Sequence, residues 1–191
     1  MSLRLYLVRH PKPSVAPAMC YGASDVAVSN DAIQAALDAL AGVLPAGVPV
    51  FSSPLQRCTA LATPLAASLG AGAPSLDARL AEMDFGDWEM RSWDAIERAE
   101  INAWAADLTG YRPGSGENVL AVGRRVIGFL DDLLKTRQPS AIVICHAGTI
   151  RLLLAWQNGD ALCTIARRAA SVAHEIAYGQ MLVLDCRSSP A

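Results

Sequence analysis

Short apolar runs alternate with longer amphipathic stretches along the chain. The apolar runs are bounded by polar or turn-forming residues, a pattern typical of buried strands. They predict strands at Leu3–Val8, Val48–Ser52, Ser75–Asp77 and Ala141–Cys145. Two further strands, Val172–Tyr178 and Met181–Cys186, flank Gly179. The connection between these last two is too short for a crossover helix, so we expect them to pair as a hairpin.

Stretches with a helical apolar period lie between the strands. Ser29 or Asn30 is expected to cap a helix that runs to about Val43. Ser53 is expected to cap a second helix, with Pro54 at its first position and its end near Leu69. Further helices are predicted at Ser92–Trp104, at Glu117–Lys135 and from near Gly148 onward.

The alternation of strands and helices predicts the fold class. We expect an α/β protein built as a three-layer α/β/α sandwich, with a mixed sheet that is mostly parallel and has one antiparallel strand. The length of 191 residues fits a single domain spanning residues 1–191.

The composition excludes several classes of function. Hydrophobic residues make up 52% of the chain, which predicts a sizeable core. The net charge of −2 without a basic run argues against nucleic-acid binding.

The longest apolar stretch, Ala141–Trp156, contains His146 and Arg151 and is too short and polar to span a membrane. Arg9 ends the first apolar run, so no signal peptide is expected. Five scattered cysteines without a metal-ligand spacing indicate free thiols, and we expect a cytoplasmic protein.

Polar side chains gather where the predicted strands end. In open α/β sheets, ligands bind beyond the carboxyl ends of the strands. Each residue there, taken alone, is typical of a surface position, but two arginines and two histidines at one edge favour a small anion. Helix N-termini after Ser53 and His146 would add backbone donors. The residues at these ends are Arg9, His10, Ser52, Ser53, Arg57, Asp77, Arg79, Glu82 and His146.

Arg57 falls in the first turn of its predicted helix. The helix macrodipole disfavours a cation there by about 0.3–1 kcal/mol. An anion between the helix end and the guanidinium would satisfy both, so this position supports the same anion site.

Four segments resemble, in order, those of the histidine phosphatase superfamily, which includes the cofactor-dependent phosphoglycerate mutases. They are Leu7-Val8-Arg9-His10, Ser52–Cys58 around a second arginine, Arg79–Glu89 as an acid loop, and Cys145–Arg151 around a second histidine. Gly116-Glu117 before a long helix is a further similarity. The loop Cys20-Tyr21-Gly22-Ala23-Ser24-Asp25 is similar to that of α-ribazole phosphatase-like members, so the chain looks closest to that branch.

The resemblance implies a phosphomonoester hydrolase that acts through phosphohistidine on a small phosphorylated metabolite. α-Ribazole 5′-phosphate, from late cobalamin assembly, is one such compound. His10 would be the nucleophile, and Glu82 would protonate the leaving alkoxide and later deprotonate water. The residues implied to hold the phosphate oxygens are Arg9, Arg57 and His146. No metal or other cofactor is implied, because the guanidinium pair would neutralise the developing charge.

Other residues receive weaker interpretations. Tyr21 and Gly22 are expected to bind the substrate by closing over the leaving group. Trp88, Trp93 and Trp104 could line a substrate cleft, but packing is the preferred interpretation. His174 is expected to be structural.

Two alternative functions stay open. Phosphoglycerate mutase or sugar bisphosphatase activity is one, although this chain is shorter than mutases with insertions that shield phosphohistidine. A non-catalytic module that binds a phospho-ligand is the other. It rests on Pro11, which stands where the family usually has glycine and removes a backbone N–H.

Overall fold

The structure, a computed structural model, describes residues 2–157, 160–171 and 175–187. Within these residues, five strands form one sheet in the order β3-β2-β4-β1-β5. The strands are β1 (Ser2–Arg9), β2 (Val50–Ser52), β3 (Ser75–Leu76), β4 (Ser140–Cys145) and β5 (Met181–Arg187). β5 pairs antiparallel with β1, and the other neighbouring pairs are parallel. The expected mixed sheet is confirmed.

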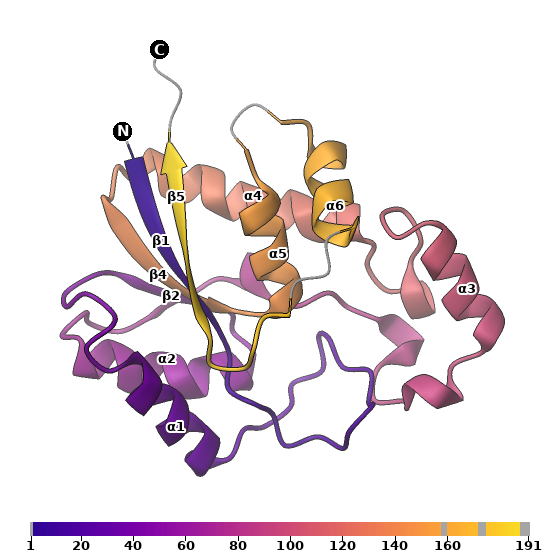
Figure 1. The fold of residues 1–191 in the computed structure, drawn as a ribbon, viewed down its shortest axis with the longest axis horizontal. Helices are drawn as coiled ribbons and strands as arrows, with labels where there is room; N and C mark the ends of the chain where they lie inside the picture. The colour runs from indigo at the N-terminus through magenta and orange to yellow at the C-terminus, as the bar shows by residue number, and fades with distance from the viewer. Residues whose placement is uncertain (1, 158–159, 172–174, 188–191) are drawn as a thin grey trace.

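Helices cover both faces of this sheet (Figure 1). One layer holds α1 (Asn30–Leu40) and α2 (Gln56–Ser68). The opposite layer holds α4 (Val119–Lys135), α5 (Ala147–Ala155) and α6 (Leu162–Ser171), while α3 (Arg98–Ala106) lies away from the sheet (Figure 1). The three-layer sandwich is confirmed. Among the described residues, none of these helices has the length and apolar character needed to cross a membrane.

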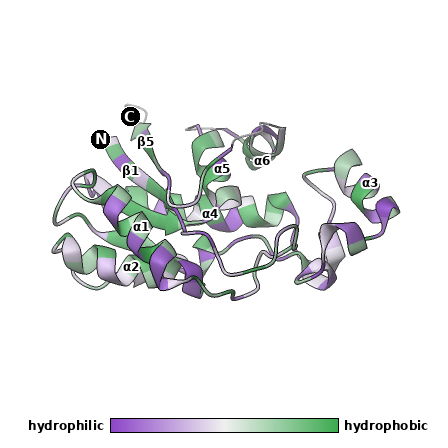
Figure 2. Ribbon diagram, turned by 60° about the horizontal axis from the view of Figure 1, so that its bottom comes forward, coloured by the Kyte–Doolittle hydropathy of each residue, from purple (hydrophilic) through white to green (hydrophobic). Residues whose placement is uncertain are grey.

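Strand β4 lies at the centre of the core and is buried on both faces. Ile142 and Ile144 pack in the cluster formed with α1 and α2, whereas Val143 and Cys145 pack in the cluster formed with α4 and α5. This alternation follows from the two-residue period of a strand. Figure 2 shows the apolar strands between the helix layers. Burial on both faces explains why the strand appears in the sequence as a continuous apolar run.

Closely packed glycines fix the segment that carries the acid loop. Backbone 84–88 lies against backbone 114–116, so a Cβ on Gly116 would be 2.2 Å from the carbonyl oxygen of Asp84. A Cβ on Gly86 would be 2.0 Å from the carbonyl oxygen of Gly114. Only glycine permits this approach, which holds the acid loop on the connector that precedes α4.

Two helix predictions are wrong in detail. Ser53 does not cap α2, which begins at Gln56 after Leu55 without a side-chain cap. The Ser53 hydroxyl lies 2.8 Å from the ring of His146 instead. The helix predicted at Ser92–Trp104 is divided into a 3₁₀ turn, Trp93–Ala95, and α3.

The predicted hairpin is also wrong. Residues 175–178 form no strand, and 172–174, which include His174, lie outside the described residues. β5 pairs with the edge of β1 instead. The segment before β5 turns toward the site, where the carbonyl of Ile176 accepts a hydrogen bond from Arg9. Helix α6, which was not predicted, precedes this segment in the chain.

Candidate active site

The strand ends bring both histidines and Arg57 together. His10 follows β1, His146 follows β4, and Arg57 lies in the first turn of α2. All three are buried, with exposed fractions of 2% for His10 and 0% for Arg57 and His146. Nε of Arg57 donates to Nδ1 of His146 over 3.2 Å, and the two imidazole rings are 5.1 Å apart. The structure thus brings these three of the expected site residues together.

The two candidate arginines are held by backbone carbonyls and aromatic rings. Arg57 donates to the carbonyl oxygens of Ser24, over 2.7 Å, and Gly22, over 2.5 Å. The Arg9 guanidinium lies 3.8 Å from the ring centre of Tyr178, and its Nε is buried without a hydrogen-bond partner. No ion pair in the described part of the chain includes either arginine. The positive charges therefore face the site without a carboxylate partner.

Hydrogen bonds fix opposite tautomers of the two imidazoles. Nδ1 of His10 lies 2.7 Å from the carbonyl oxygen of Pro11, which can only accept, so Nδ1 carries the proton. Nε2 of His10 is then the nitrogen with the free lone pair. In His146, Nδ1 accepts from Arg57, so Nε2 carries the proton and donates to Ser53 over 2.8 Å.

Burial keeps both imidazoles neutral. Burial lowers the pKa of His10 to about 3, and the positive charges of Arg57 and Arg9 act in the same direction, against the effect of the Pro11 carbonyl. Burial also lowers the pKa of His146 well below 6.5, helped by Arg57. A neutral His10 has the lone pair that a nucleophile needs.

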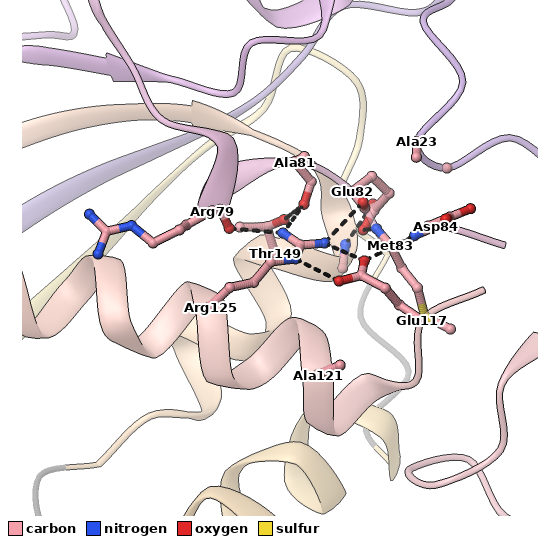
Figure 3. A network of polar contacts seen from close by, with 12 residues as sticks. Ala23, Arg79, Ala81, Glu82, Met83, Asp84, Glu117, Ala121, Arg125 and Thr149 are labelled. Atoms are coloured by element: carbon pink, nitrogen blue, oxygen red, sulfur yellow. Dashed lines mark hydrogen bonds and ion pairs between the residues drawn. The ribbon is translucent and has the colours of Figure 1, made fainter. Parts of the chain in front are cut away.

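Glu82 reaches the same edge from the acid loop. Its Oε1 accepts from the backbone N–H of Met83 and its Oε2 from that of Gly148, each over 3.1 Å. Gly148 lies in the first turn of α5, two residues after His146. Arg79, by contrast, extends away from Glu82 (Figure 3) and pairs with Asp77 and Asp132, so neither it nor Asp77 belongs to the site.

A cavity of about 700 Å³ adjoins Glu82 and Tyr21. Tyr21 and Tyr178 bond through their hydroxyls over 2.7 Å, and their rings lie beside Arg57 and Arg9 respectively. The rest of the lining is mainly apolar and includes Met19, Met83, Phe85, Val119, Trp93 and Trp104. Trp93 and Trp104 thus both pack and line the cavity, whereas Trp88 is buried outside it. Gly22 does not line the cavity.

Gly22 instead belongs to a loop organised by Glu89, a residue that the sequence analysis missed. The Glu89 carboxylate accepts from the backbone N–H groups of Gly22, Ala23, Ser24 and Phe85 and from the Ser24 hydroxyl. Burial opposes ionisation of Glu89, but these hydrogen bonds lower its pKa below the ordinary value. Glu89 therefore orients the carbonyls that hold Arg57. Its partners Gly22 and Ala23 are 67 and 66 residues away along the chain, so the local sequence around Glu89 carries no signal of this role.

Potential metal ligands do not cluster at this site. Across the residues that the structure describes, no group of three or more His, Cys, Asp or Glu side chains is placed to hold a metal ion. Cys58, whose Sγ lies 3.5 Å from Nε2 of His146, is the thiol nearest the histidines in the described contacts. Burial raises the pKa of Cys58 to about 12, so its thiol stays protonated.

The fold is that of an α/β protein with a buried basic site at the carboxyl ends of its strands. The chain belongs to the histidine phosphatase superfamily: residues 5–178 match the family described as "Histidine phosphatase superfamily (branch 1)". This match confirms the resemblance to that superfamily expected from the sequence.

Individual relatives differ in the substrates that their names carry. A protein of Hydrogenobacter thermophilus named for phosphoserine phosphatase activity is 26% identical over 117 residues, 59% of this chain and 57% of that protein. The adenosylcobalamin/alpha-ribazole phosphatase of Escherichia coli K12 is 38% identical over 80 residues, 40% of this chain and 39% of that protein. The aligned segments thus span little more than half of the first relative's length and less of the second's. The structure of a mycobacterial glucosyl-3-phosphoglycerate phosphatase has the same fold, with a TM-score of 0.78, 22% identity, and 97% of this chain and 91% of that chain covered.

The first prediction concerns the buried imidazoles. We expect His10 and His146 to stay neutral in the folded protein well below pH 6.5, because burial disfavours the charged form. In the unfolded chain both take up a proton near the ordinary value of 6.5. The unfolded state therefore binds more protons below pH 6.5. As the pH is lowered from there, the free energy of unfolding should decrease by about 1.4 kcal/mol per pH unit for each ring. Titration of the ring nitrogens by NMR checks this, with His10→Asn for assignment. A His10 ring that titrates near pH 6.5 would contradict it.

The second prediction concerns Gly148. In Gly148→Ala, the new Cβ would lie 2.4 Å from Oε1 of Glu82, so the carboxylate must move. Because that atom is the end of a flexible side chain, the thermal unfolding midpoint should change little, while turnover of an alkyl phosphate should drop at least 10-fold, roughly as for a misplaced catalytic group. Gly128→Ala in α4 is the matched control, since nothing lies within 4 Å of its new Cβ. Unchanged turnover in Gly148→Ala would show that the Glu82 position is unimportant.

Proposed function

We propose that the protein hydrolyses phosphomonoesters by way of a phosphohistidine at His10 and needs no metal ion. One observation carries this proposal. The guanidinium of Arg57 is fully buried next to two neutral imidazoles, and the described ion pairs include no carboxylate for it. Burying a cation without an anion is costly, so such a site is built for an anionic ligand.

In the first step, Nε2 of His10 attacks phosphorus while the bond to the ester oxygen breaks. Arg9, Arg57 and His146 stabilise the charge that develops on the other phosphate oxygens. Glu82 gives its proton to the leaving alkoxide.

In the second step, Glu82, now a carboxylate, takes a proton from water. The resulting hydroxide attacks the phosphorus of phosphohistidine, the bond to Nε2 breaks, and inorganic phosphate leaves. His10 and Glu82 then have their starting protonation states. The opposite tautomers support this division of roles, since the Pro11 carbonyl leaves the lone pair on Nε2 of His10.

The cavity next to Glu82 supports a substrate whose leaving group is bulky and partly apolar. A volume of about 700 Å³ with aromatic lining suits a nucleoside-like group better than a small sugar acid. Together with the similarity to the Escherichia coli adenosylcobalamin/alpha-ribazole phosphatase over 80 residues, this makes α-ribazole 5′-phosphate, a cobalamin precursor, our first candidate. Tyr21 would close over that group.

Two alternatives are distinguished by the same assays. Mutase or sugar bisphosphatase activity predicts transfer between hydroxyls of phosphoglycerate, or preference for a bisphosphate. A non-catalytic binding module predicts phosphate affinity without turnover. A panel of α-ribazole 5′-phosphate, phosphoserine, 3-phosphoglycerate and fructose bisphosphate, assayed for released phosphate and for mutase products, separates all three.

The third prediction separates the roles of His10 and Glu82. His10→Ala should abolish both phosphoenzyme formation and turnover. Glu82→Gln keeps the shape but not the proton, so turnover of an alkyl phosphate should fall by about 10²–10⁴-fold. Release of a good aryl leaving group in the first turnover should fall much less. Rapid quenching of Glu82→Gln should then trap acid-labile, base-stable phosphohistidine. Phosphoenzyme that persists in His10→Ala would refute the assigned nucleophile.

The fourth prediction concerns metal ions. Turnover should survive exhaustive treatment with a chelator, since the guanidinium groups of Arg9 and Arg57 supply the charge that metals supply in two-metal phosphatases. Phosphate release before and after EDTA and gel filtration measures this. Complete loss, with recovery on adding magnesium or zinc, would overturn the proposed chemistry.

A further inference from the structure

Arg125, on α4, binds the backbone of the segment that carries Glu82. Nη1 donates to the carbonyl oxygens of Arg79, over 2.8 Å, and Ala81, over 2.6 Å. Nη2 donates to the carbonyl oxygen of Glu82 over 3.1 Å. One guanidinium thus bonds to three carbonyls within four residues, between the 3₁₀ turn Ala78–Leu80 and the acid itself (Figure 3).

Glu117 completes this arrangement from the N-terminal side of α4. Its carboxylate accepts from Nε and Nη2 of Arg125, over 3.0 and 2.7 Å, and from the backbone N–H of Asp84 over 3.1 Å. The backbone N–H of Glu117 donates to the carbonyl of Asp84 over 2.7 Å. The pair is partly buried, with side-chain exposures of 19% for Arg125 and 28% for Glu117. Arg125 and Glu117 therefore hold the chain on both sides of Glu82.

These hydrogen bonds satisfy backbone carbonyls that regular secondary structure leaves without partners. After the 3₁₀ turn, the chain runs extended through Ala81 and forms no sheet with β3 or its neighbours. Its carbonyls need partners, because unpaired buried backbone groups are costly. Thr149 on α5 supplies a weaker contact, with its hydroxyl 3.3 Å from the carbonyls of Leu80 and Ala81. Arg125 thus supplies three of the side-chain hydrogen bonds that hold the backbone leading to Glu82.

We propose that Arg125, paired with Glu117, is a positioning residue for Glu82: it fixes the backbone from which the acid reaches the leaving group. This inference rests on the proposed role of Glu82. A displacement of a catalytic group by about 1 Å lowers rates by about 10²-fold, so the effect is measurable. In the described hydrogen bonds, Arg125 contacts one residue that lines the cavity, Glu82, through its backbone carbonyl, and none of the candidate phosphate ligands.

The fifth prediction tests this by leaving-group dependence. Arg125→Met should slow the first-turnover release of an alkyl leaving group by about 10–100-fold, but that of p-nitrophenol by less than about 3-fold. Arg125→Lys keeps the charge without the planar fork, and should show the same selective loss. Retention of the alkyl rate in Arg125→Lys would mean that charge alone matters and would overturn the proposal. Arg124→Met is the matched control, because Arg124 is the exposed neighbour on the same helix.

A double-mutant cycle provides the decisive comparison. If Arg125 acts through Glu82, then Glu82→Gln with Arg125→Met should release the alkyl group no more slowly than Glu82→Gln alone. The proposal would be overturned if the double variant lost the product of the two single losses in alkyl release rate. It would also be overturned if Arg125→Met lost equally on the alkyl and the aryl substrate.

If Arg125→Met does not fold, as judged by circular dichroism, Glu117→Gln is tested in the same cycle. Glu117→Gln keeps one acceptor oxygen but removes the negative charge that pairs with Arg125. The same selective loss of alkyl release is therefore expected, and an unchanged alkyl rate overturns the proposal. If Glu82→Gln itself slowed the alkyl and the aryl substrate equally, the proposed role of Glu82, and not that of Arg125, would be refuted.

Discussion

The burial of the Arg57 guanidinium is the constraint on which the rest of the site depends. Arg57 lies in the first turn of α2, where the macrodipole already disfavours a cation. The protein compensates only partly, with two backbone carbonyls and the lone pair of His146. Burial, together with the positive charge of Arg57, lowers the pKa values of both His10 and His146. One buried cation thus favours an anionic ligand and helps to keep His10, the proposed nucleophile, neutral.

Two loops must be held in place for this arrangement, and one carboxylate connects them. Glu89 accepts from the N–H groups of Gly22 and Ser24, whose carbonyls point to Arg57, and also from Phe85 in the acid loop. A Cβ on Gly22 would lie 1.9 Å from the carbonyl oxygen of Met83, so only glycine lets the two loops meet. The proposed phosphate ligand Arg57 and the proposed acid Glu82 are therefore held by connected loops, with Glu89 between the loops and Arg125 bonded to the backbone of Glu82.

The sequence predicted those features that follow from local pattern and sheet geometry. Strands such as Ala141–Cys145 are buried on both faces, and the strand-end rule placed Arg57 and His146 at one edge. The contacts of Glu89 and Arg125 could not be predicted in this way, because they join loops and helices that are far apart in the chain. The strand expected at Val172–Tyr178 is wrong over its described residues, 175–178, for the same reason: the Ile176 carbonyl accepts a hydrogen bond from Arg9, which is far away in the chain.

Pro11 illustrates how a departure from the family pattern can leave the central chemistry in place. A proline has no backbone N–H, so one potential hydrogen-bond donor to phosphate is absent. Its carbonyl, however, accepts from Nδ1 of His10 over 2.7 Å and so keeps the lone pair on Nε2. The ring also restricts His10 to an extended backbone, which suits the end of β1. The loss is then one hydrogen bond among several that would hold the phosphate, while the tautomer of the nucleophile is unaffected. This balance favours a working phosphatase over a module that only binds.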